Sequence, residues 1–239
     1  MRNCQKKNWR INLQPHLLRF QKDQKYLFID TETECLNLCH NKPWEVSFIT
    51  TKYDEVESEN QIFVWYDDLV VGQGAAVVTG FSTDNYESFK RRGTQKYSIR
   101  GKVVDTVKPE QAVKTLISYL YDPSYIIVWH NGQRFDSFTL NNLFKIAQKE
   151  LDYSFISRTI DTVALARAIE KGVNDYNFKE EPSLNFKWAN FYEKKMKVNQ
   201  KALLEKYEIS HDVNKLHEGI YDLQCLKKIF FKQIWGINI

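Results

Sequence analysis

The sequence has few of the residues that mark fibrous, low-complexity, disulfide-rich or membrane-spanning proteins. Of its 239 residues, nine are glycine, five are proline and four are cysteine. These low counts argue against a collagen-like chain and against a disulfide framework. No apolar run approaches the roughly 20 residues that a membrane-spanning helix needs, and the polar start MRNCQKKNWR lacks the apolar core of a signal peptide. We therefore expect an intracellular protein without a membrane segment.

An excess of one charge is also missing, because 34 Lys and Arg face 30 Asp and Glu, for a net charge of +4. This balance permits a nucleic-acid partner without requiring one. With 43% hydrophobic and 14% aromatic residues, the chain can build a core, which excludes wholesale disorder. The length favours a single α/β-type domain at 25–239, preceded by a basic extension at 1–24. Apolar residues of this extension could form a short docking helix: Leu13, Leu17, Leu18 and Phe20.

Hydrophobic periodicity predicts a β-meander followed by alternating helices and strands. Apolar runs predict strands at 25–30, 44–51, 61–67, 125–129 and 154–160. We interpret 54–60 as a turn and 69–78 as an extension of the meander. Helical spacing predicts helices from Pro109 and over 134–149, 161–170, 183–188 and 215–234. Residues 82–108 fit neither pattern and are interpreted as an insertion. The order predicts one mixed sheet covered by helices.

Two carboxylates stand at the end of the first predicted strand. Asp30 and Glu32 are two positions apart, so in an extended strand both point to the same face. Two carboxylates at such a short distance repel each other unless a cation lies between them. A third acid, Asp136, falls in the first turn of the helix that follows strand 125–129. Taken singly, these acids are equally consistent with a turn or with a helix N-terminus, where the macrodipole favours negative charge.

The last predicted helix opens with HEGIYD, which contains His217 and Asp222. Five residues of an α-helix separate two side chains by about 140°, so these two cannot share one helical face. They can reach one site only if His217 lies in a loop before the helix, which Gly219 makes feasible. Together, four acids and one histidine predict an all-oxygen site for Mg²⁺ or Mn²⁺. This combination suits phosphodiester hydrolysis.

Three segments, DTETECL, HNGQRFD and HEGIYD, stand in the order found in the DnaQ-like 3′–5′ exonucleases of the DEDDh group. The chain resembles this family over most of residues 25–235, and HNGQRFD is similar to the three-prime repair exonuclease branch. The segment IDTVALARAI resembles the strand-to-helix step between the family's second and third motifs. Glu218 stands where the sibling group has a catalytic tyrosine. The resemblance implies an α/β, ribonuclease H-like fold with a five-stranded mixed sheet flanked by helices.

The resemblance also implies roles for individual residues. Two Mg²⁺ or Mn²⁺ ions would be held by four acids: Asp30, Glu32, Asp136 and Asp222. The general base that deprotonates the attacking water would be His217. Substrate contacts are expected from Thr31, Leu36, Asn131, Lys90, Arg91 and Arg92, with Leu36 in the place of the residue that wedges against the terminal base. The expected partner is nucleic acid with a free 3′ end, single-stranded DNA being favoured, and a homodimer is one conceivable assembly.

The chain departs from the family's usual pattern at two points. Glu34 and Cys35 replace the usual Thr-Gly of the first motif, whereas Leu36 is kept. Glu34 adds an acid near an anionic substrate, which bears on affinity and on the geometry of end binding. Trp129 replaces a small residue before His130.

Several alternative interpretations stay open from the sequence. The same motifs fit an enzyme that trims RNA, and a non-catalytic nucleic-acid-binding module could keep the nuclease fold. Zinc at Cys35, Cys39 and His40 is a weaker alternative, because further ligands at a familiar spacing are missing. His211 is the rival to His217 as the base. Basic and aromatic residues interleave in 82–108, which suits contact with a single strand, although a solvated loop explains the segment equally well.

Overall fold

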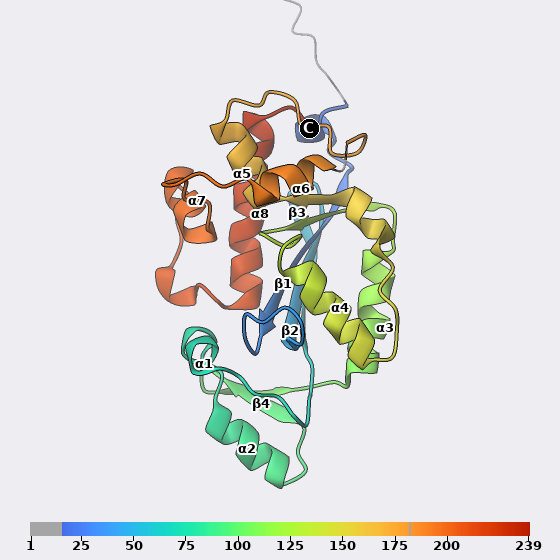
Figure 1. The fold of residues 1–239 in the computed structure, drawn as a ribbon, viewed down its shortest axis with the longest axis vertical. Helices are drawn as coiled ribbons and strands as arrows, with labels where there is room; N and C mark the ends of the chain where they lie inside the picture. Colours follow the sequence, from blue (N-terminus) through green and yellow to red (C-terminus); the bar gives the residue numbers. More distant parts are fainter. Residues whose placement is uncertain (1–15, 182) are drawn as a thin grey trace, which may run out of the picture.

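A five-stranded mixed sheet forms the centre of the protein (Figure 1). The structure, a computed structural model, describes residues 16–181 and 183–239. The strand order is β3-β2-β1-β6-β7, in which the first three strands are antiparallel and the last two run parallel to β1. The strands are β1 (Lys25–Thr33), β2 (Pro43–Lys52), β3 (Glu55–Phe63), β6 (Tyr125–Trp129) and β7 (Thr159–Asp161). The predicted mixed sheet is therefore confirmed.

Strand β1 extends past its parallel neighbour, which leaves room at its carboxyl end. Its pairing with β6 runs from Lys25 to Phe28 and stops there. Its antiparallel pairing with β2 continues, so that Asp30 lies opposite Ser47 and Glu32 lies opposite Glu45. In open α/β sheets, ligands bind outside the carboxyl ends of the parallel strands. The two acids of β1 therefore lie where this architecture usually holds a ligand.

Helices cover both faces of the sheet, and alternate residues of β1 point into different layers. Leu27 and Ile29 pack in the layer under α3 and α4, whereas Tyr26 and Phe28 pack in the layer under α5 and α8. Helix α6 packs on α5, and α7 packs on α8. The helix bounds are α3 (Pro109–Leu120), α4 (Asp136–Ile146), α5 (Thr162–Glu170), α6 (Ser183–Asn190), α7 (Gln200–Lys206) and α8 (Gly219–Gly236).

Three secondary-structure predictions were wrong. Residues 55–60, predicted as part of a turn, belong to β3, because the hairpin turns at Tyr53 and Asp54, where Tyr53 has a φ of 50°; β3 also ends at Phe63, before the end of the predicted strand 61–67. Residues 69–78, interpreted as an extension of the meander, contain helix α1 (Gln73–Thr79). Residues 154–160, predicted as a strand, are mostly the 3₁₀ helix Tyr153–Arg158, and only their end enters β7. Asp152 caps that 3₁₀ helix by accepting a hydrogen bond from the Ser154 N–H at 2.8 Å.

Residues 64–107 fold into a compact unit at the carboxyl end of β1, which we call the insertion subdomain (Figure 1). It contains the predicted insertion 82–108 almost entirely. Its aromatic core continues the main core, because Trp65 stacks on Tyr97 with ring centroids 5.4 Å apart and Trp44 of β2 contacts Tyr97 edge-on. Besides α1, its elements are α2 (Thr83–Arg91), β4 (Lys96–Ile99) and β5 (Lys102–Asp105).

The segment before β1 packs against the end of the chain. The Leu18 N–H donates to the Ile239 carbonyl at 2.8 Å, and the Arg19 guanidinium donates to the Ile237 carbonyl at 3.2 Å. Leu18 begins a short 3₁₀ helix, so part of the expected docking helix is present. Leu13 and the basic residues of 1–15 lie outside the described residues. Over 16–181 and 183–239, none of the helices has the length and apolar character needed to cross a membrane.

Replacing Tyr97 by Phe tests whether the insertion subdomain unfolds together with the sheet. The buried Tyr97 hydroxyl donates to the Val64 carbonyl at 2.6 Å and accepts from the Tyr66 N–H at 3.3 Å. A buried polar group left without a partner costs about 1–3 kcal/mol, so Tyr97→Phe should lower the free energy of unfolding by about that amount in urea. Tyr192→Phe, at a position that is 82% exposed, should leave it unchanged. Equal urea midpoints for Tyr97→Phe and the parent would contradict this prediction.

Candidate active site

The first pair of acids projects from β1 toward the layer of α5 and α8. Tyr26 and Phe28 already lie in that layer, and Asp30 and Glu32 continue the same face of the strand. Burial raises the pKa of Asp30 well above its usual range, and the negative charge of Asp136 raises it further. The acids at this end of β1 are therefore close enough to repel one another electrostatically.

Asp136 is the first residue of α4 and is buried. Its Oδ1 accepts a hydrogen bond from the Thr31 hydroxyl at 2.8 Å, and the same hydroxyl lies 3.1 Å from the Thr139 hydroxyl. Burial raises the pKa of Asp136 to about 7, although the Thr31 hydrogen bond opposes this shift. Thr31, predicted as a substrate contact, thus uses its side chain to tie β1 to α4.

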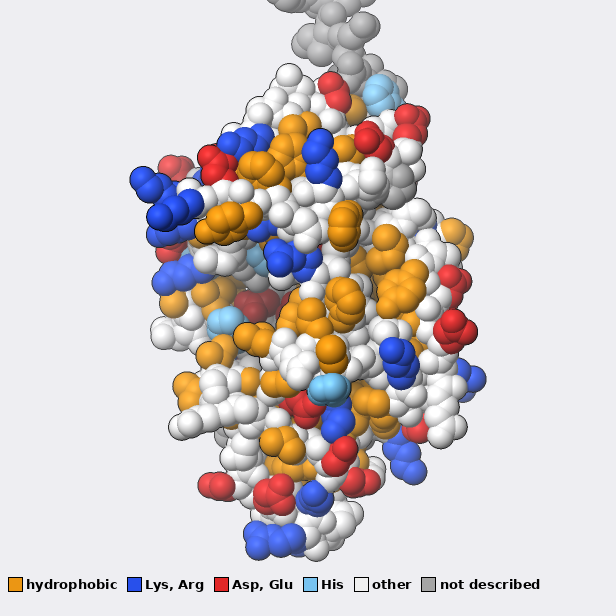
Figure 2. Space-filling model, viewed as in Figure 1, with side chains coloured by type: hydrophobic (Ala, Val, Ile, Leu, Met, Phe, Trp, Pro, Cys, Tyr) orange, Lys and Arg blue, Asp and Glu red, His pale blue; other side chains and the backbone are white. Residues whose placement is uncertain are grey.

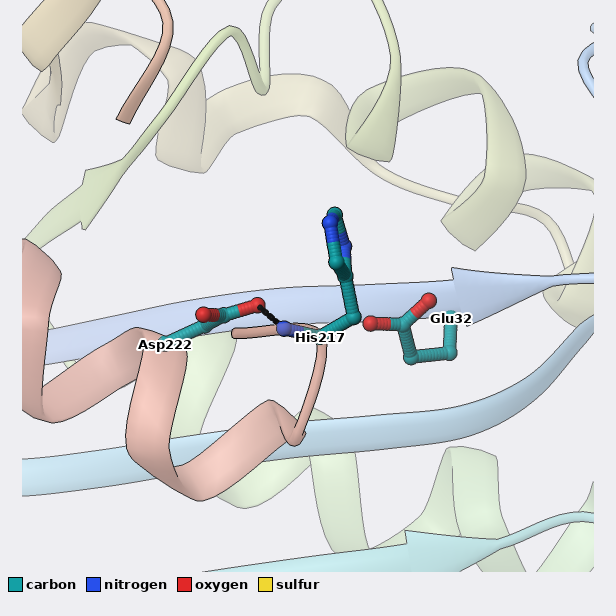
Figure 3. Close-up of side chains that lie close together, drawn as sticks. All are labelled: Glu32, His217 and Asp222. Carbon is teal, nitrogen blue, oxygen red and sulfur yellow. Dashed lines mark hydrogen bonds between the residues drawn. The ribbon is translucent and has the colours of Figure 1, made fainter. Parts of the chain in front are cut away.

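His217 lies in the segment before α8 rather than in the helix, with a φ of 67°. Its N–H donates to Asp222 Oδ2 at 2.9 Å, and Asp222 lies in the first turn of α8 (Figure 3). The imidazole rises between the carboxylates of Asp222 and Glu32 (Figure 3). Potential ligand atoms of these three residues all lie within 4.8 Å of one another. The loop position of His217 is the one that helical geometry required.

A fifth carboxylate, Glu45 of β2, lies beside this cluster and was not singled out from the sequence. It is buried, and its Oε1 accepts hydrogen bonds from the Ser47 hydroxyl at 2.6 Å and the Gln61 amide at 2.8 Å. A Cβ at Gly219 would lie 2.2 Å from Glu45 Oε1, so a side chain there would displace the Glu45 carboxylate. Burial raises the pKa of Glu45, and its one sequence signal is an acid inside the apolar strand WEVSFITT.

The donor set fits a hard divalent cation. Asp222 Oδ1 is buried without a hydrogen-bond partner, and burial raises the pKa of this carboxyl to about 7. Burial also raises the pKa of Glu32, and the charges of Glu45 and Asp222 add to that shift. A cation would compensate this repulsion, since carboxylate oxygens are the ligands that Mg²⁺ and Mn²⁺ prefer. Asp30 and Asp136 lie outside the cluster of Glu32, His217 and Asp222. The negative charges of Glu32 and Asp222 nevertheless contribute to the raised pKa of Asp30.

The alternative zinc ligands and the alternative base that the sequence offered do not lie together in a comparable cluster. Among residues 16–181 and 183–239, Glu32, His217 and Asp222 form the one cluster of three potential ligands. Cys35, Cys39 and His40 therefore do not form a zinc site there. The ring Nδ1 of His211 lies 2.9 Å from the Ile209 carbonyl, outside the acidic cluster.

A groove of about 460 Å³ runs from Glu32 between the loop after β1 and helix α1. Leu36 lines it and is 84% exposed, and Phe135 lines it from the start of α4. On the face shown in Figure 2, acidic side chains lie recessed in a hollow that is bordered by hydrophobic side chains. Glu34, which the sequence placed near the substrate, is buried, and its Oε2 accepts from the Val70 N–H at 3.2 Å. The Glu34 carboxylate therefore binds the backbone of the segment that leads to α1.

The loop that precedes Asp136 is held by a buried acid, Asp161. This carboxylate accepts hydrogen bonds from the N–H groups of Asn131 at 3.0 Å, Gln133 at 3.3 Å and Val163 at 2.9 Å. Asn131 has a φ of 63°, a conformation that needs such support. The sequence located Asp161 only as part of a strand-to-helix step. Its function in the structure is to fix the loop from which α4 and Asp136 start.

Trp129, which departs from the family's usual small residue, is fully buried against Phe155. The large ring leaves no space for a side chain at Gly132, where a Cβ would lie 2.2 Å from it. His130 is turned inward, with its Nδ1 2.8 Å from the Thr162 hydroxyl. Burial lowers the pKa of His130 to about 4, so this histidine is neutral at physiological pH.

The basic residues predicted to hold the substrate lie at the carboxyl end of α2, which packs on β4. Lys90 lies 5.8 Å from the centre of the Tyr86 ring, and the Arg92 guanidinium lies 5.1 Å from the centre of the Phe89 ring. Arg91 is exposed. None of these three basic residues lines the groove beside Leu36, so a strand would have to extend beyond that groove to meet them.

Comparison with known proteins identifies the fold. The sequence matches no protein-family model, and no curated protein matches it. A structure of exonuclease I superposes with a TM-score of 0.62 at 18% identity over 86% of this chain. Escherichia coli exonuclease I in complex with a dA16 oligonucleotide gives a TM-score of 0.62 at 16% identity over 87%. The zinc-bound form of the E. coli complex with single-stranded DNA gives 0.61 at 17% identity over 88%.

The chain spans about 40% of the length of these exonuclease I structures. The five-stranded mixed sheet, flanked by helices on both faces, is the ribonuclease H-like fold that the sequence motifs predicted. At this level of identity the likeness establishes the fold.

The raised carboxyl pKa values predict how stability depends on pH and metal. Burial raises the pKa values of Asp136 and Asp222 in the folded chain to about 7, from an ordinary value of 3.8. Between these values the folded chain binds more protons than the unfolded chain, so stability should fall as pH rises from about 4 to about 7. In EDTA, we expect a lower Tm at about pH 8 than at about pH 5. Mg²⁺ or Mn²⁺ should raise the Tm more at the higher pH, where the ligands are ionised.

Scanning fluorimetry measures both effects, with Asp222→Asn as the matched variant. Because this substitution removes one of the repelling charges, it should reduce the pH-dependent loss of Tm and the stabilisation by metal together. A pH dependence and a metal response that match those of the parent would refute the assignment of Asp222 to the cluster.

Proposed function

We propose that this chain is a divalent-metal-dependent 3′–5′ exonuclease that removes nucleotides from single-stranded DNA. The observation that carries the proposal is the clustering of Glu32, His217 and Asp222 within 4.8 Å, at the carboxyl end of β1. The ribonuclease H-like fold and its likeness to exonuclease I, which has been captured with single-stranded DNA, support this substrate class. The resemblance of HNGQRFD to the three-prime repair branch supports the direction of digestion.

The acidic residues have the chemistry to hold the metal. Mg²⁺ or Mn²⁺, two per site in this proposal, would supply positive charge for the scissile phosphate and for the attacking water. The residues that would hold it are Asp30, Glu32, Asp136 and Asp222. Thr31 orients Asp136 through its hydroxyl at 2.8 Å, and Gly219 leaves the space that the Glu45 carboxylate occupies.

His217 would act as the general base. Burial lowers the pKa of its imidazole, and the positive charge of Arg100 lowers it further. The ring is therefore neutral at pH 7 to 8 and can accept a proton from water at a ring nitrogen. As water attacks phosphorus, the bond to the 3′ oxygen of the preceding nucleotide breaks, and a nucleoside 5′-monophosphate leaves. Leu36 and Phe135 offer apolar surface on which the terminal base can stack.

Digestion of 3′-labelled oligonucleotides tests this function. Single-stranded DNA, double-stranded DNA and RNA of one sequence should be compared side by side, with Mg²⁺ and with EDTA. We expect Mg²⁺-dependent release of mononucleotides, fastest from single-stranded DNA and with weak base preference. Faster release from RNA would make the chain an RNA-trimming enzyme, and binding without release would make it a nucleic-acid-binding module.

His217→Ala should lower the rate of release by about 10²–10⁴ while metal binding persists, because the carboxylates are unchanged. Asp222→Asn should abolish release altogether. His211→Ala is the matched control, since His211 lies at the Ile209 carbonyl and outside the cluster, and it should turn over at the parent rate. If His211→Ala, and not His217→Ala, lost the release of nucleotides, the assignment of the base to His217 would be wrong.

The basic end of α2 is proposed to hold the DNA backbone beyond the groove. Replacing Lys90, Arg91 and Arg92 together by Ala should raise KM with less effect on kcat, because these exposed side chains lie away from the reacting atoms. The salt dependence of binding should flatten by about 0.7 for each phosphate that the variant no longer binds. Measurement of KM over a range of salt concentrations checks both effects. An unchanged KM and salt slope would remove α2 from the substrate path.

A further inference from the structure

The turn of the β4–β5 hairpin carries an arginine in an unusual backbone conformation. Arg100 has a φ of 50° and Gly101 a φ of 76°. Two consecutive left-handed residues form the turn that suits tight hairpins, and asparagine or glycine usually occupies its first position. The Arg100 N–H donates to the Gly80 carbonyl at 2.8 Å, and a Cβ on Gly80 would lie 2.4 Å from the Arg100 Cγ. Both glycines therefore let Arg100 occupy this position.

The Arg100 guanidinium reaches from the insertion subdomain to the segment before α8. Its Nη1 donates to the Asn214 carbonyl at 2.9 Å, and its Nη2 donates to the Leu216 carbonyl at 3.0 Å. The same group pairs with Glu218 Oε1 at 3.3 Å and donates from Nε to the Thr79 carbonyl at 3.3 Å. One side chain thus connects the end of α1 to the residues on both sides of His217.

These contacts fix the peptide group that carries His217. The Leu216 carbonyl and the His217 N–H belong to the same planar unit. Its oxygen accepts from Arg100 at 3.0 Å, and its N–H donates to Asp222 at 2.9 Å. Since both ends of the plane are held, the direction in which the His217 side chain leaves the backbone is also set. A φ of 67° at a non-glycine residue persists only where its surroundings over-determine it.

We propose that Arg100 is a positioning residue that holds the His217 peptide in the orientation needed for catalysis. The inference rests on the proposed function and assigns the insertion subdomain a part in it. The planar fork of arginine can donate to two carbonyl oxygens and a carboxylate at once. A lysine keeps the charge but has a single nitrogen, so it cannot replace that geometry.

Steady-state kinetics on single-stranded DNA separate positioning from substrate binding. Arg100→Ala should lower kcat by about 10²-fold, the scale of loss for a small misplacement of a reacting group, while KM changes little. Arg100→Lys should stay closer to Arg100→Ala than to the parent. Lys114→Ala, which removes one positive charge from an exposed position of α3, is the control and should retain the parent kcat and KM.

Hydrogen exchange of the free protein tests whether Arg100 holds the segment before α8, without any turnover. In Arg100→Ala, amides of 213–218 should exchange faster, whereas amides of α2 and β4 should keep their protection. If the parent released no nucleotides, the proposed function would fail, and the exchange result would still decide whether Arg100 holds this segment.

Three results would overturn the proposal. An unchanged kcat in Arg100→Ala would show that the His217 peptide needs no clamp. A rise in KM alone would make Arg100 a substrate contact. Loss of protection throughout the insertion subdomain, with full activity in Arg100→Lys, would mean that Arg100 serves the fold and not the histidine.

Discussion

Repulsion among buried carboxylates at the carboxyl end of β1 is the constraint that the surrounding structure must satisfy. Burial raises the pKa of each acid, and several raise one another's: Asp30, Glu32, Glu45, Asp136 and Asp222. Such groups stay together only when other interactions hold the elements that carry them. Four elements, β1, β2, α4 and α8, carry these acids, and three of the acids accept a hydrogen bond from a neighbouring group. The Thr31 hydroxyl binds Asp136, the Ser47 hydroxyl binds Glu45, and the His217 N–H binds Asp222.

The parts of this site that follow from local geometry could be predicted from the sequence. The two-residue period of a strand placed Asp30 and Glu32 on one face, and the structure has them on β1 with that spacing. The helical angle required His217 to lie in a loop before Asp222, and its φ of 67° shows that it does. The central strands and long helices followed from periodicity in the same way, because packing and local preference agree there. These inferences need only a chain segment and its own geometry.

Contacts between distant segments could not be predicted, and they decide the rest of the site. Arg100 reaches Asn214 and Leu216 across more than one hundred residues, and no local pattern signals such a contact. Helix α1 was misjudged because its valines and alanines fit a strand as well as a helix, and tertiary contacts chose between them. Glu45 gave a weak signal, since Glu45 and Ser47 alternate with apolar residues, a pattern that is also typical of a strand with one exposed face.

The insertion subdomain connects the groove beside Leu36 to the segment that carries His217. Ala75, Val78 and Thr79 of α1 line the groove beside Leu36, so this helix forms one wall of the space beside Glu32. The carbonyls of Val78 and Thr79 accept from the same guanidinium that holds the Leu216 carbonyl. The wall of the groove and the backbone of His217 are therefore fastened to one side chain. A shift of α1 would therefore strain the contacts that orient His217, even though 114 residues separate Arg100 from Asn214.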